Sequence, residues 1–247
     1  MTFEDNFSRQ AGQYALHRPV YPERLFAFIA EQAPALERAW DCATGNGQAA
    51  HGMAAHVREV IATDASSDQI AHARPHERIH YRVAPADASG LPAGSVDIVT
   101  IATALHWLDL DRFYAEVHRV LKPGGVLAAW SYFGQTVGRD IDPILTRYSR
   151  EIVGPYWSPR IVKVHGTYND LPFPFEEIEA PPFVIEVEWS AGDILGYLGS
   201  WSATQKFIEV NGEHPLNHIR EELEHAWGNG LRTVRWPLTM RIGRTPC

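Results

Sequence analysis

Between Ala39 and Phe133, short apolar runs rich in β-branched residues alternate with stretches that suit helices. The predicted strands cover residues 39–43, 57–64, 79–84, 96–102 and 126–133, and the predicted helices between them cover 48–56, 67–74 and 109–121. Such alternation is typical of βαβ units around a parallel sheet. Because these crossovers are right-handed, the carboxyl ends of the strands should meet at one edge, where open α/β sheets bind their ligands.

The flanking segments complete a single predicted domain in this chain of 247 residues. We divide it into a lid over residues 1–38, a core over 39–133 and a C-terminal part over 134–247. The flanks add strands at 184–189 and 234–242 and helices at 23–32, 193–201 and 215–227. We therefore expect a seven-stranded, mostly parallel sheet with helices on both faces, the last two helices capping its ligand-binding edge.

The charge balance of the chain argues against a nucleic-acid partner. Its formal net charge is −8, whereas affinity for nucleic acid depends on Lys and Arg that neutralise phosphates. The two cysteines, Cys42 and Cys247, have no zinc-ligand spacing and suit a reducing compartment. The N-terminal residues lack the pattern of a signal peptide, and no run approaches the roughly 20 apolar residues that span a bilayer. We expect a cytoplasmic protein that binds neither nucleic acid nor membrane.

A turn of small residues, Asp-Cys-Ala-Thr-Gly-Asn-Gly at 41–47, joins the first predicted strand to a helix. Small residues let the backbone approach a ligand closely, and Gly45 and Gly47 can adopt positive φ. Turns of this kind are common, so this one indicates a ligand site only if the residues at the ends of the next strands also suit a ligand. Asp64 ends the second strand and Asp87 follows the third.

These two acids fit the polar parts of an adenosine-type ligand. Asp64 can accept hydrogen bonds from both ribose hydroxyls, as an acid about 20 residues after the loop does in dinucleotide-binding proteins. Asp87 can accept one from the exocyclic amine of adenine. Alternatively, Asp64 caps the helix that begins near Ser66, and Asp87 is an ordinary turn residue. With Asp41, three acids at three consecutive strand ends favour the ligand-binding interpretation.

Five motifs in this order and spacing resemble those of class I S-adenosylmethionine-dependent methyltransferases of the methyltransferase type 11 kind. They are residues 41–47, 64–66, 86–88, 94–99 and 119–125. The resemblance implies a Rossmann-like fold, with S-adenosyl-L-methionine as cofactor and S-adenosyl-L-homocysteine as its product. It implies a cofactor site that comprises Ala43, Gly45 and Gly47 at the methionine and ribose part, Asp64 and Ala65 at the ribose, Asp87 and Ala88 at the adenine, and Ala102 and Thr103.

Residues 100–109, together with Tyr14, Arg18 and Tyr21, narrow the resemblance to the trans-aconitate methyltransferase-like branch. In that branch an N-terminal segment folds over the cofactor. Tyr14 and Arg18 are therefore predicted cofactor contacts, with Arg18 paired to the methionine carboxylate unless it is a solvated surface residue. The chain departs from the family at Ala43, where the first glycine of the loop is usual. Alanine is the smallest substitution, so cofactor binding is expected to survive if Ala43 keeps a negative φ.

His106 is the candidate catalytic residue, because it follows the fourth strand beside the expected methyl donor. A histidine with a pKa near 6.5 can act as a general base at neutral pH, although it could instead orient the acceptor or hold the loop. The predicted acceptor pocket is lined by Trp107, Trp130, Tyr132, Trp157, Trp201 and Ser202. The remaining histidines lack metal-ligand spacing, so no metal is predicted.

The predicted reaction is direct attack of a small-molecule acceptor on the sulfonium methyl group, with sulfur leaving in line. The resemblance favours carboxylates among such acceptors, and a carboxylate needs no base, so that His106 would then only orient it. Two alternatives stay open. One is a nicotinamide-dependent oxidoreductase, which requires a G-x-G-x-x-G turn that this loop lacks. The other is a cofactor-binding protein of the same fold without catalysis.

Overall fold

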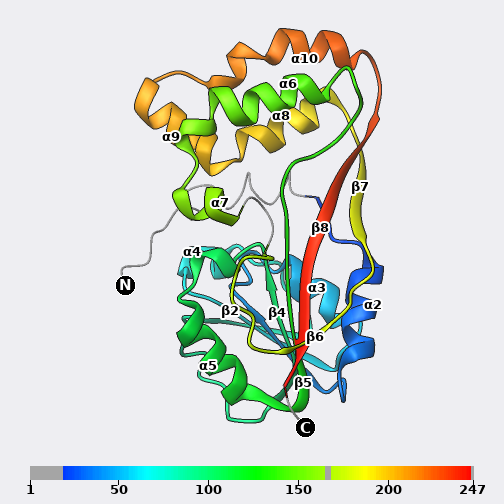
Figure 1. Cartoon of the computed structure of the whole chain (residues 1–247), viewed down its shortest axis with the longest axis vertical. Helices are drawn as coiled ribbons and strands as arrows, with labels where there is room; N and C mark the ends of the chain where they lie inside the picture. The colour runs from blue at the N-terminus through cyan, green and yellow to red at the C-terminus, as the bar shows by residue number, and fades with distance from the viewer. Residues whose placement is uncertain (1–18, 165–167, 246–247) are drawn as a thin grey trace.

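An eight-stranded sheet is the framework of the computed structural model, which describes residues 19–164 and 168–245 (Figure 1). The strands are β1 (Arg38–Cys42), β2 (Glu59–Asp64), β3 (Ile79–Val83), β4 (Val96–Ala102), β5 (Leu121–Tyr132), β6 (Glu176–Ile178), β7 (Phe183–Trp189) and β8 (Arg232–Arg244). Their order is β3-β2-β1-β4-β5-β8-β6, and β7 also pairs with β8. The first five strands are parallel, whereas β8 is antiparallel to β5, β6 and β7.

The predicted Rossmann-like, mostly parallel sheet is confirmed, but its strand count of seven is wrong. The additional strand is β6, which has only three residues, two of them exposed glutamates. So short a segment carries no alternation of apolar and polar residues, and this alternation is the signal by which a strand is recognised.

Helices cover both faces of the parallel strands. On one face lie α2 (Glu23–Gln32) and α3 (Gln48–Ala54), and on the other lies α5 (Leu110–Val120); α4 (Ser67–Ala71) follows β2 (Figure 1). The side chains of β5 alternate between the two resulting cores. Val126, Ala128 and Trp130 pack with α2 and α3, while Leu127 and Ala129 pack with α5. The predicted helices at 23–32 and 109–121 are confirmed, the second with Asp109 as its N-cap.

The C-terminal part forms a helical cap over the carboxyl ends of the parallel strands (Figure 1). The cap comprises α6 (Asp142–Arg147), α8 (Ala191–Gly199), α9 (Ser202–Asn211) and α10 (Arg220–Trp227), with the short helices η3 (Tyr148–Ile152), η4 (Gly154–Tyr156) and η5 (Pro215–His218). The long strands β7 and β8 connect the cap to the core, and α7 (Pro159–Val164) lies between the two parts. Within 19–164 and 168–245, no helix combines the length and apolar character needed to cross a bilayer.

Asp97 is fully buried in β4, and its carboxylate connects the amino ends of β1, β4 and β5. Its Oδ2 accepts hydrogen bonds from the backbone N–H groups of Glu37 (3.0 Å) and Arg38 (2.9 Å) at the start of β1. Its Oδ1 accepts one from Lys122 Nζ at 2.7 Å, near the start of β5. A buried charge is stable only when paired and hydrogen-bonded, and Asp97 meets both conditions.

Candidate functional site

A cavity of about 540 Å³ opens at the carboxyl ends of β1, β2, β4 and β5. This volume lies within the range of small-molecule sites, roughly 300–1,000 Å³. Its walls are residues 43–46, 64–66, 84–87, 102–104 and 107–109, with further side chains that include Tyr21, Asp41, Tyr132 and Arg160. The cavity spans the point between β1 and β4 where the strand order reverses, which is where open α/β sheets bind ligands.

The glycine loop after β1 is fastened to the end of β2. Thr44 N–H donates to the carbonyl of Thr63 (2.9 Å), and Gly45 N–H donates to Oδ2 of Asp64 (2.9 Å). Gly45 and Gly47 have φ of +57° and +93°. A Cβ added at Gly47 would meet Tyr81 Oη at 2.2 Å, so space as well as conformation requires glycine there. The backbone conformation at Gly45 and Gly47 and the space at Gly47 thus explain why this loop has small residues.

Asp64 holds the loop and faces the cavity at the same time. Its Oδ1 accepts a hydrogen bond from Ser66 N–H (2.9 Å), while Ser66 Oγ accepts one from Gln69 N–H (3.2 Å) and caps α4. The N-cap is thus Ser66 and not Asp64. A carboxylate accepts about four hydrogen bonds, so the two backbone bonds are compatible with ribose hydroxyls as further donors. The loop and this carboxylate fit the adenosine part of the expected cofactor.

Asp87 also lines the cavity, and it forms an ion pair with Arg112 of α5 (2.8 Å). An adenine amine would therefore share this carboxylate with a guanidinium group. Arg112 also lines the cavity, but the sequence did not predict it as a site residue. A single arginine on a helix is most often exposed to solvent and gives no indication of a binding role. The structure brings together Ala43, Gly45, Asp64, Ala65 and Asp87 around one cavity; Ala102 and Thr103 join them, while Gly47 and Ala88 are not among its lining residues.

Asp41 at the end of β1 is almost completely buried against the same cavity. Burial raises its pKa from an ordinary value of 3.8 to about 6, although the hydroxyls of Thr100 and Thr44 donate hydrogen bonds to its two oxygens. The folded protein therefore takes up a proton on Asp41 as the pH falls towards 6, at a pH where the unfolded chain has none there.

Asp41→Asn is expected to change how stability depends on pH. Because the folded-state pKa exceeds the unfolded one, the contribution of Asp41 is present below about pH 4 and is lost as the pH rises through about 6. The loss amounts to about 3 kcal/mol in the free energy of unfolding. Urea unfolding measures the free energy of unfolding of both proteins at pH 4 and at pH 7. From pH 4 to pH 7 the value for the wild-type protein should fall by about that much more than the value for the variant. Equal pH dependence in both proteins would contradict the assigned pKa.

Ala43 departs from the conformation on which the sequence prediction depended. Its φ is +52°, so the condition of a negative φ is not met. The turn requires the left-handed region here, as the usual glycine would, and an L-residue with a Cβ adopts it at a cost of about 1–2 kcal/mol. The loop therefore stores strain at this position without losing its hydrogen bonds to β2.

Ala43→Gly is expected to stabilise the protein by about 0.5–1 kcal/mol, because relief of the strain exceeds the added entropy of the unfolded glycine. Urea unfolding at constant pH measures the gain. Ala27→Gly in the middle of α2 provides the control, since it places a glycine inside a helix and should destabilise by about 1 kcal/mol. A loss of stability in both variants would mean that Ala43 is not strained.

Tyr14 and Arg18, the predicted contacts from the lid, lie outside the described residues. Tyr21 is the described residue of that segment that reaches the cavity. Its Oη lies 3.3 Å from Thr103 Oγ1, and its ring meets the edge of Trp130 with centroids 5.5 Å apart. Thr103 has a φ of +56°, and its N–H donates to the carbonyl of Trp130 (2.7 Å). These contacts join the lid segment to the ends of β4 and β5.

His106 lies in η2 (Leu105–Trp107), beside the cavity but not among its lining residues. Its Nδ1 is 3.3 Å from Oη of the buried Tyr168, and its ring packs against Trp107 with centroids 5.0 Å apart. Burial, with a contribution from the positive charge of Arg160, lowers its pKa to about 4. His106 is therefore neutral at physiological pH, and its basicity is low.

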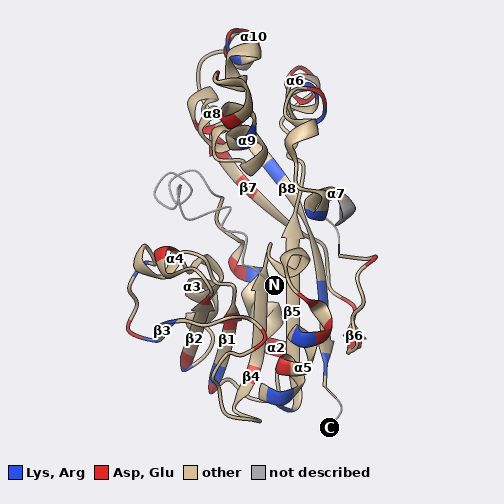
Figure 2. Cartoon of the chain, turned by 90° about the vertical axis from the view of Figure 1, so that its left-hand side faces the viewer, with Lys and Arg blue, Asp and Glu red and all other residues tan. Residues whose placement is uncertain are grey.

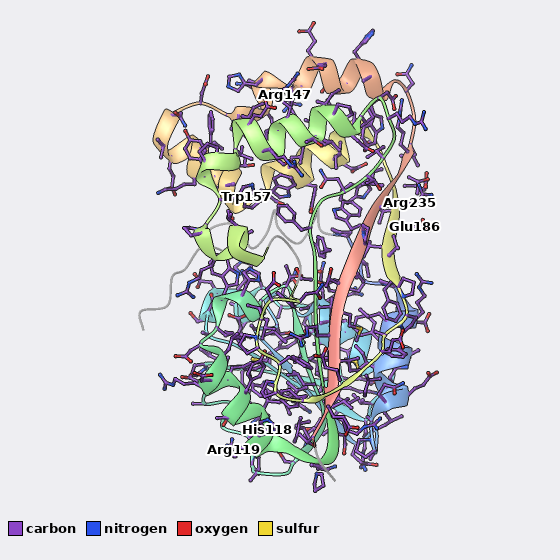
Figure 3. All side chains as sticks on the ribbon, viewed as in Figure 1. His118, Arg119, Arg147, Trp157, Glu186 and Arg235 are labelled. Atoms are coloured by element: carbon purple, nitrogen blue, oxygen red, sulfur yellow. The ribbon has the colours of Figure 1, made fainter. Side chains whose placement is uncertain are left out.

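The predicted acceptor-pocket residues separate into two groups. Trp107 and Tyr132 line the cavity. Trp130 is fully buried in the core, while Trp201 packs with Trp157 in the cap, their centroids 5.2 Å apart. Figure 3 shows Trp157 between α7 and the cap helices, at the opposite end of the molecule from His118 and Arg119 on α5. Ser202 begins α9. The cap tryptophans thus form an aromatic cluster next to α7.

Charged residues on the surface are mixed in sign. Figure 2 shows basic residues interspersed with acidic ones on β7, β8 and the cap helices. Figure 3 shows Arg235 beside Glu186, and the Nε atom of Arg235 lies 2.6 Å from Oε1 of Glu186. In the part of the chain that the structure describes, no three His, Cys, Asp or Glu side chains are grouped so as to hold a metal ion.

Comparison with known proteins identifies relatives along the whole chain. Residues 40–129 match the family model of a methyltransferase domain. A protein of Dictyostelium discoideum, named as a methyltransferase, is 31% identical over 251 residues, which cover 98% of this chain and 95% of that protein. A Saccharomyces cerevisiae protein, named as an S-adenosylmethionine-dependent methyltransferase, is 30% identical over 51% of this chain and 47% of its own length.

Solved structures show the same architecture. A type II methyltransferase structure from Anaeromyxobacter dehalogenans has a TM-score of 0.87 and 43% identity, and the match covers 93% of this chain and 99% of that one. A methyltransferase structure from Bacillus halodurans, at 19% identity and a TM-score of 0.51, shares the fold. The similarity to the Anaeromyxobacter structure includes the cap as well as the core.

Proposed function

Because this chain belongs to the class I S-adenosylmethionine-dependent methyltransferases, we propose that it methylates a small-molecule acceptor bound in the cavity described above. The observation that carries the proposal is the continuity of that cavity. It joins the glycine loop and Asp64 to Trp107, Tyr132 and Arg160. Donor and acceptor would therefore lie in one continuous cavity. Membership of this family also excludes the nicotinamide-dependent alternative.

The residues of the chain position the reactants in this proposal. The bound cofactor supplies a methyl group already activated on a sulfonium sulfur. Asp64 and the loop would hold its ribose, Asp87 its adenine, and Tyr14 and Arg18 remain predicted contacts from the lid. The rings of Trp107 and Tyr132 would hold the acceptor in line and exclude water, and positioning of this kind can supply most of the acceleration.

We favour a carboxylate as the acceptor, because neither His106 nor Asp41 is well placed to act as a general base. His106 has a pKa of about 4, and both oxygens of Asp41 already accept hydrogen bonds from threonine hydroxyls. A carboxylate is ionised at neutral pH, so its oxygen can attack without losing a proton. The oxygen–methyl bond would form as the carbon–sulfur bond breaks, and the electron pair would remain on the sulfur of the product, S-adenosyl-L-homocysteine.

The proposal is tested by incubating the protein with deuteromethyl-labelled S-adenosyl-L-methionine and a panel of carboxylic acids and other metabolites. Mass spectrometry should detect a labelled ester, which alkali hydrolyses. Transfer only to nitrogen or carbon would overturn the carboxylate assignment but not methyl transfer. Calorimetric binding of a dinucleotide, with no heat from S-adenosyl-L-methionine, would overturn the whole proposal.

His106→Ala is expected to leave the affinity for S-adenosyl-L-methionine unchanged within about twofold and to lower turnover about 3- to 10-fold. This is the effect expected from losing the hydrogen bond to Tyr168 and the ring contact with Trp107, by which His106 would position the cavity wall. The rate should not depend on a histidine ionisation between pH 6 and 8, because the pKa of His106 lies near 4. A loss of 10²- to 10⁴-fold, with retained cofactor affinity, would assign His106 as a general base instead.

A further inference from the structure

Arg160 lines the cavity from α7, the short helix between cap and core. Its Nη1 donates a hydrogen bond to the backbone carbonyl of Trp107 (2.6 Å), and α7 packs against η2. This bond holds the guanidinium against the core, although Arg160 as a whole is exposed. The other N–H groups of the guanidinium remain as donors.

Among the described residues, two arginines of the cavity wall differ in their partners. Arg112 is paired with Asp87 at 2.8 Å. Arg160 has no carboxylate within ion-pair distance among residues 19–164 and 168–245. A planar guanidinium that has no carboxylate partner among the described residues, at the wall of a ligand cavity, is suited to bidentate recognition of a carboxylate or a phosphate.

The acidic residues of the cavity lie on other elements. Asp41 and Asp64 lie near the carboxyl ends of β1 and β2, Asp87 follows β3, and Asp109 caps α5, whereas Arg160 stands on α7 beside η2, which follows β4. The carboxylates of these four aspartates would repel an anionic ligand, and Arg160 would attract it. Asp109 lies near η2 in the chain, but it accepts a hydrogen bond from Arg112 N–H (3.3 Å) and forms no ion pair with Arg160 among the described residues. The aromatic side chains on the same wall include Trp107 and Tyr132, which would pack against an apolar body.

We propose, as a refinement that rests on the proposed function, that Arg160 is the specificity-determining residue of the acceptor site. It binds an anionic group, carboxylate or phosphate, on an acceptor whose apolar body lies against Trp107. Arg160 acts on the acceptor and leaves the affinity for the cofactor unchanged.

The test uses the full-length protein loaded with S-adenosyl-L-homocysteine and three probes of similar shape: phenylacetate, phenyl phosphate and the neutral phenylacetamide. Calorimetry should show at least one anion binding about tenfold or more tightly than the amide, as expected for charge-assisted hydrogen bonds. In Arg160→Gln this preference should fall to within about twofold, and Arg160→Lys should retain part of it. Arg150→Gln, at an exposed position in η3, is the matched control and should behave as wild type.

Each outcome decides between assignments. Preference for phenylacetate over phenyl phosphate would identify the anion as a carboxylate, and the reverse would identify a phosphate. An unchanged preference in Arg160→Gln, or no preference for either anion in the wild-type protein, would overturn the inference. Loss of S-adenosyl-L-homocysteine binding in Arg160→Gln would reassign the residue to the cofactor. Failure of the wild-type protein to bind S-adenosyl-L-homocysteine would count instead against the proposed function.

Discussion

Asp64→Ala is expected to abolish measurable binding of S-adenosyl-L-methionine. The carboxylate would accept charge-assisted hydrogen bonds from two ribose hydroxyls, each worth about 1.5–3 kcal/mol. Their loss would raise the Kd by a factor of roughly 10² to 10⁴. The substitution also removes the acceptor for Gly45 N–H, so the glycine loop loses its attachment to β2. Isothermal titration calorimetry measures the affinity.

The control for this experiment is Asp68→Ala, which removes a nearby exposed carboxylate on α4 that does not line the cavity. Its affinity for the cofactor should remain within about twofold of wild type. Circular dichroism and a thermal melt establish that Asp64→Ala is folded. If folded Asp64→Ala bound the cofactor as tightly as wild type, the ribose would have to be held elsewhere.

Asp97→Ala is expected to lower the free energy of unfolding by about 3–5 kcal/mol, the largest stability loss that we predict for a single side chain. It leaves two backbone N–H groups, of Glu37 and Arg38, without their acceptor, and it leaves Lys122 without its counter-charge. Breaking a buried pair by removing one partner typically costs this much. Urea unfolding followed by circular dichroism measures the loss.

Two variants separate this effect from the general loss of an acid. Asp97→Asn keeps an oxygen that can accept from the backbone and should lose less than Asp97→Ala. Glu59→Ala removes the partly exposed partner of Arg38 and should cost less than about 1 kcal/mol, as surface ion pairs do. Equal effects of Asp97→Ala and Glu59→Ala would show that burial of Asp97 contributes nothing.

The core from β1 to β5 could be predicted from the sequence, because the spacing of apolar residues and the amino-acid composition differ between its strands and its helices. The apolar stripe of α5 and the buried runs of β2 and β4 lie where the sequence placed them. The segment 121–125 was harder, because Pro123 and two glycines favour a turn. In the structure α5 ends at Val120 and β5 begins at the next residue. The register between β4 and β5 shifts at this point, so that residues 122–125 can be part of the strand.

The cap was less accessible to prediction. The helices α6 and α7 have six residues each, too few to show a helical period, and residues 215–227 divide into η5 and α10 at Ile219. In the candidate site, Asp41, Asp64 and Asp87 could be identified from the sequence because each stands at or just after the end of a core strand. Arg112 and Arg160 reach the cavity through the packing of α5 and α7, and sequence spacing does not encode that packing.

The position of β8 has a consequence for how the chain folds. This strand pairs with β5, β6 and β7, and its register joins Val126 to Arg244, residues far apart in sequence. Until residues 232–244 are available, β5 presents an open edge and β7 has no partner strand. Pairings of such long range are slow to form, and unpaired edges invite association between chains. During synthesis on the ribosome, the interval before β8 emerges should therefore be the stage at which this protein most needs a chaperone.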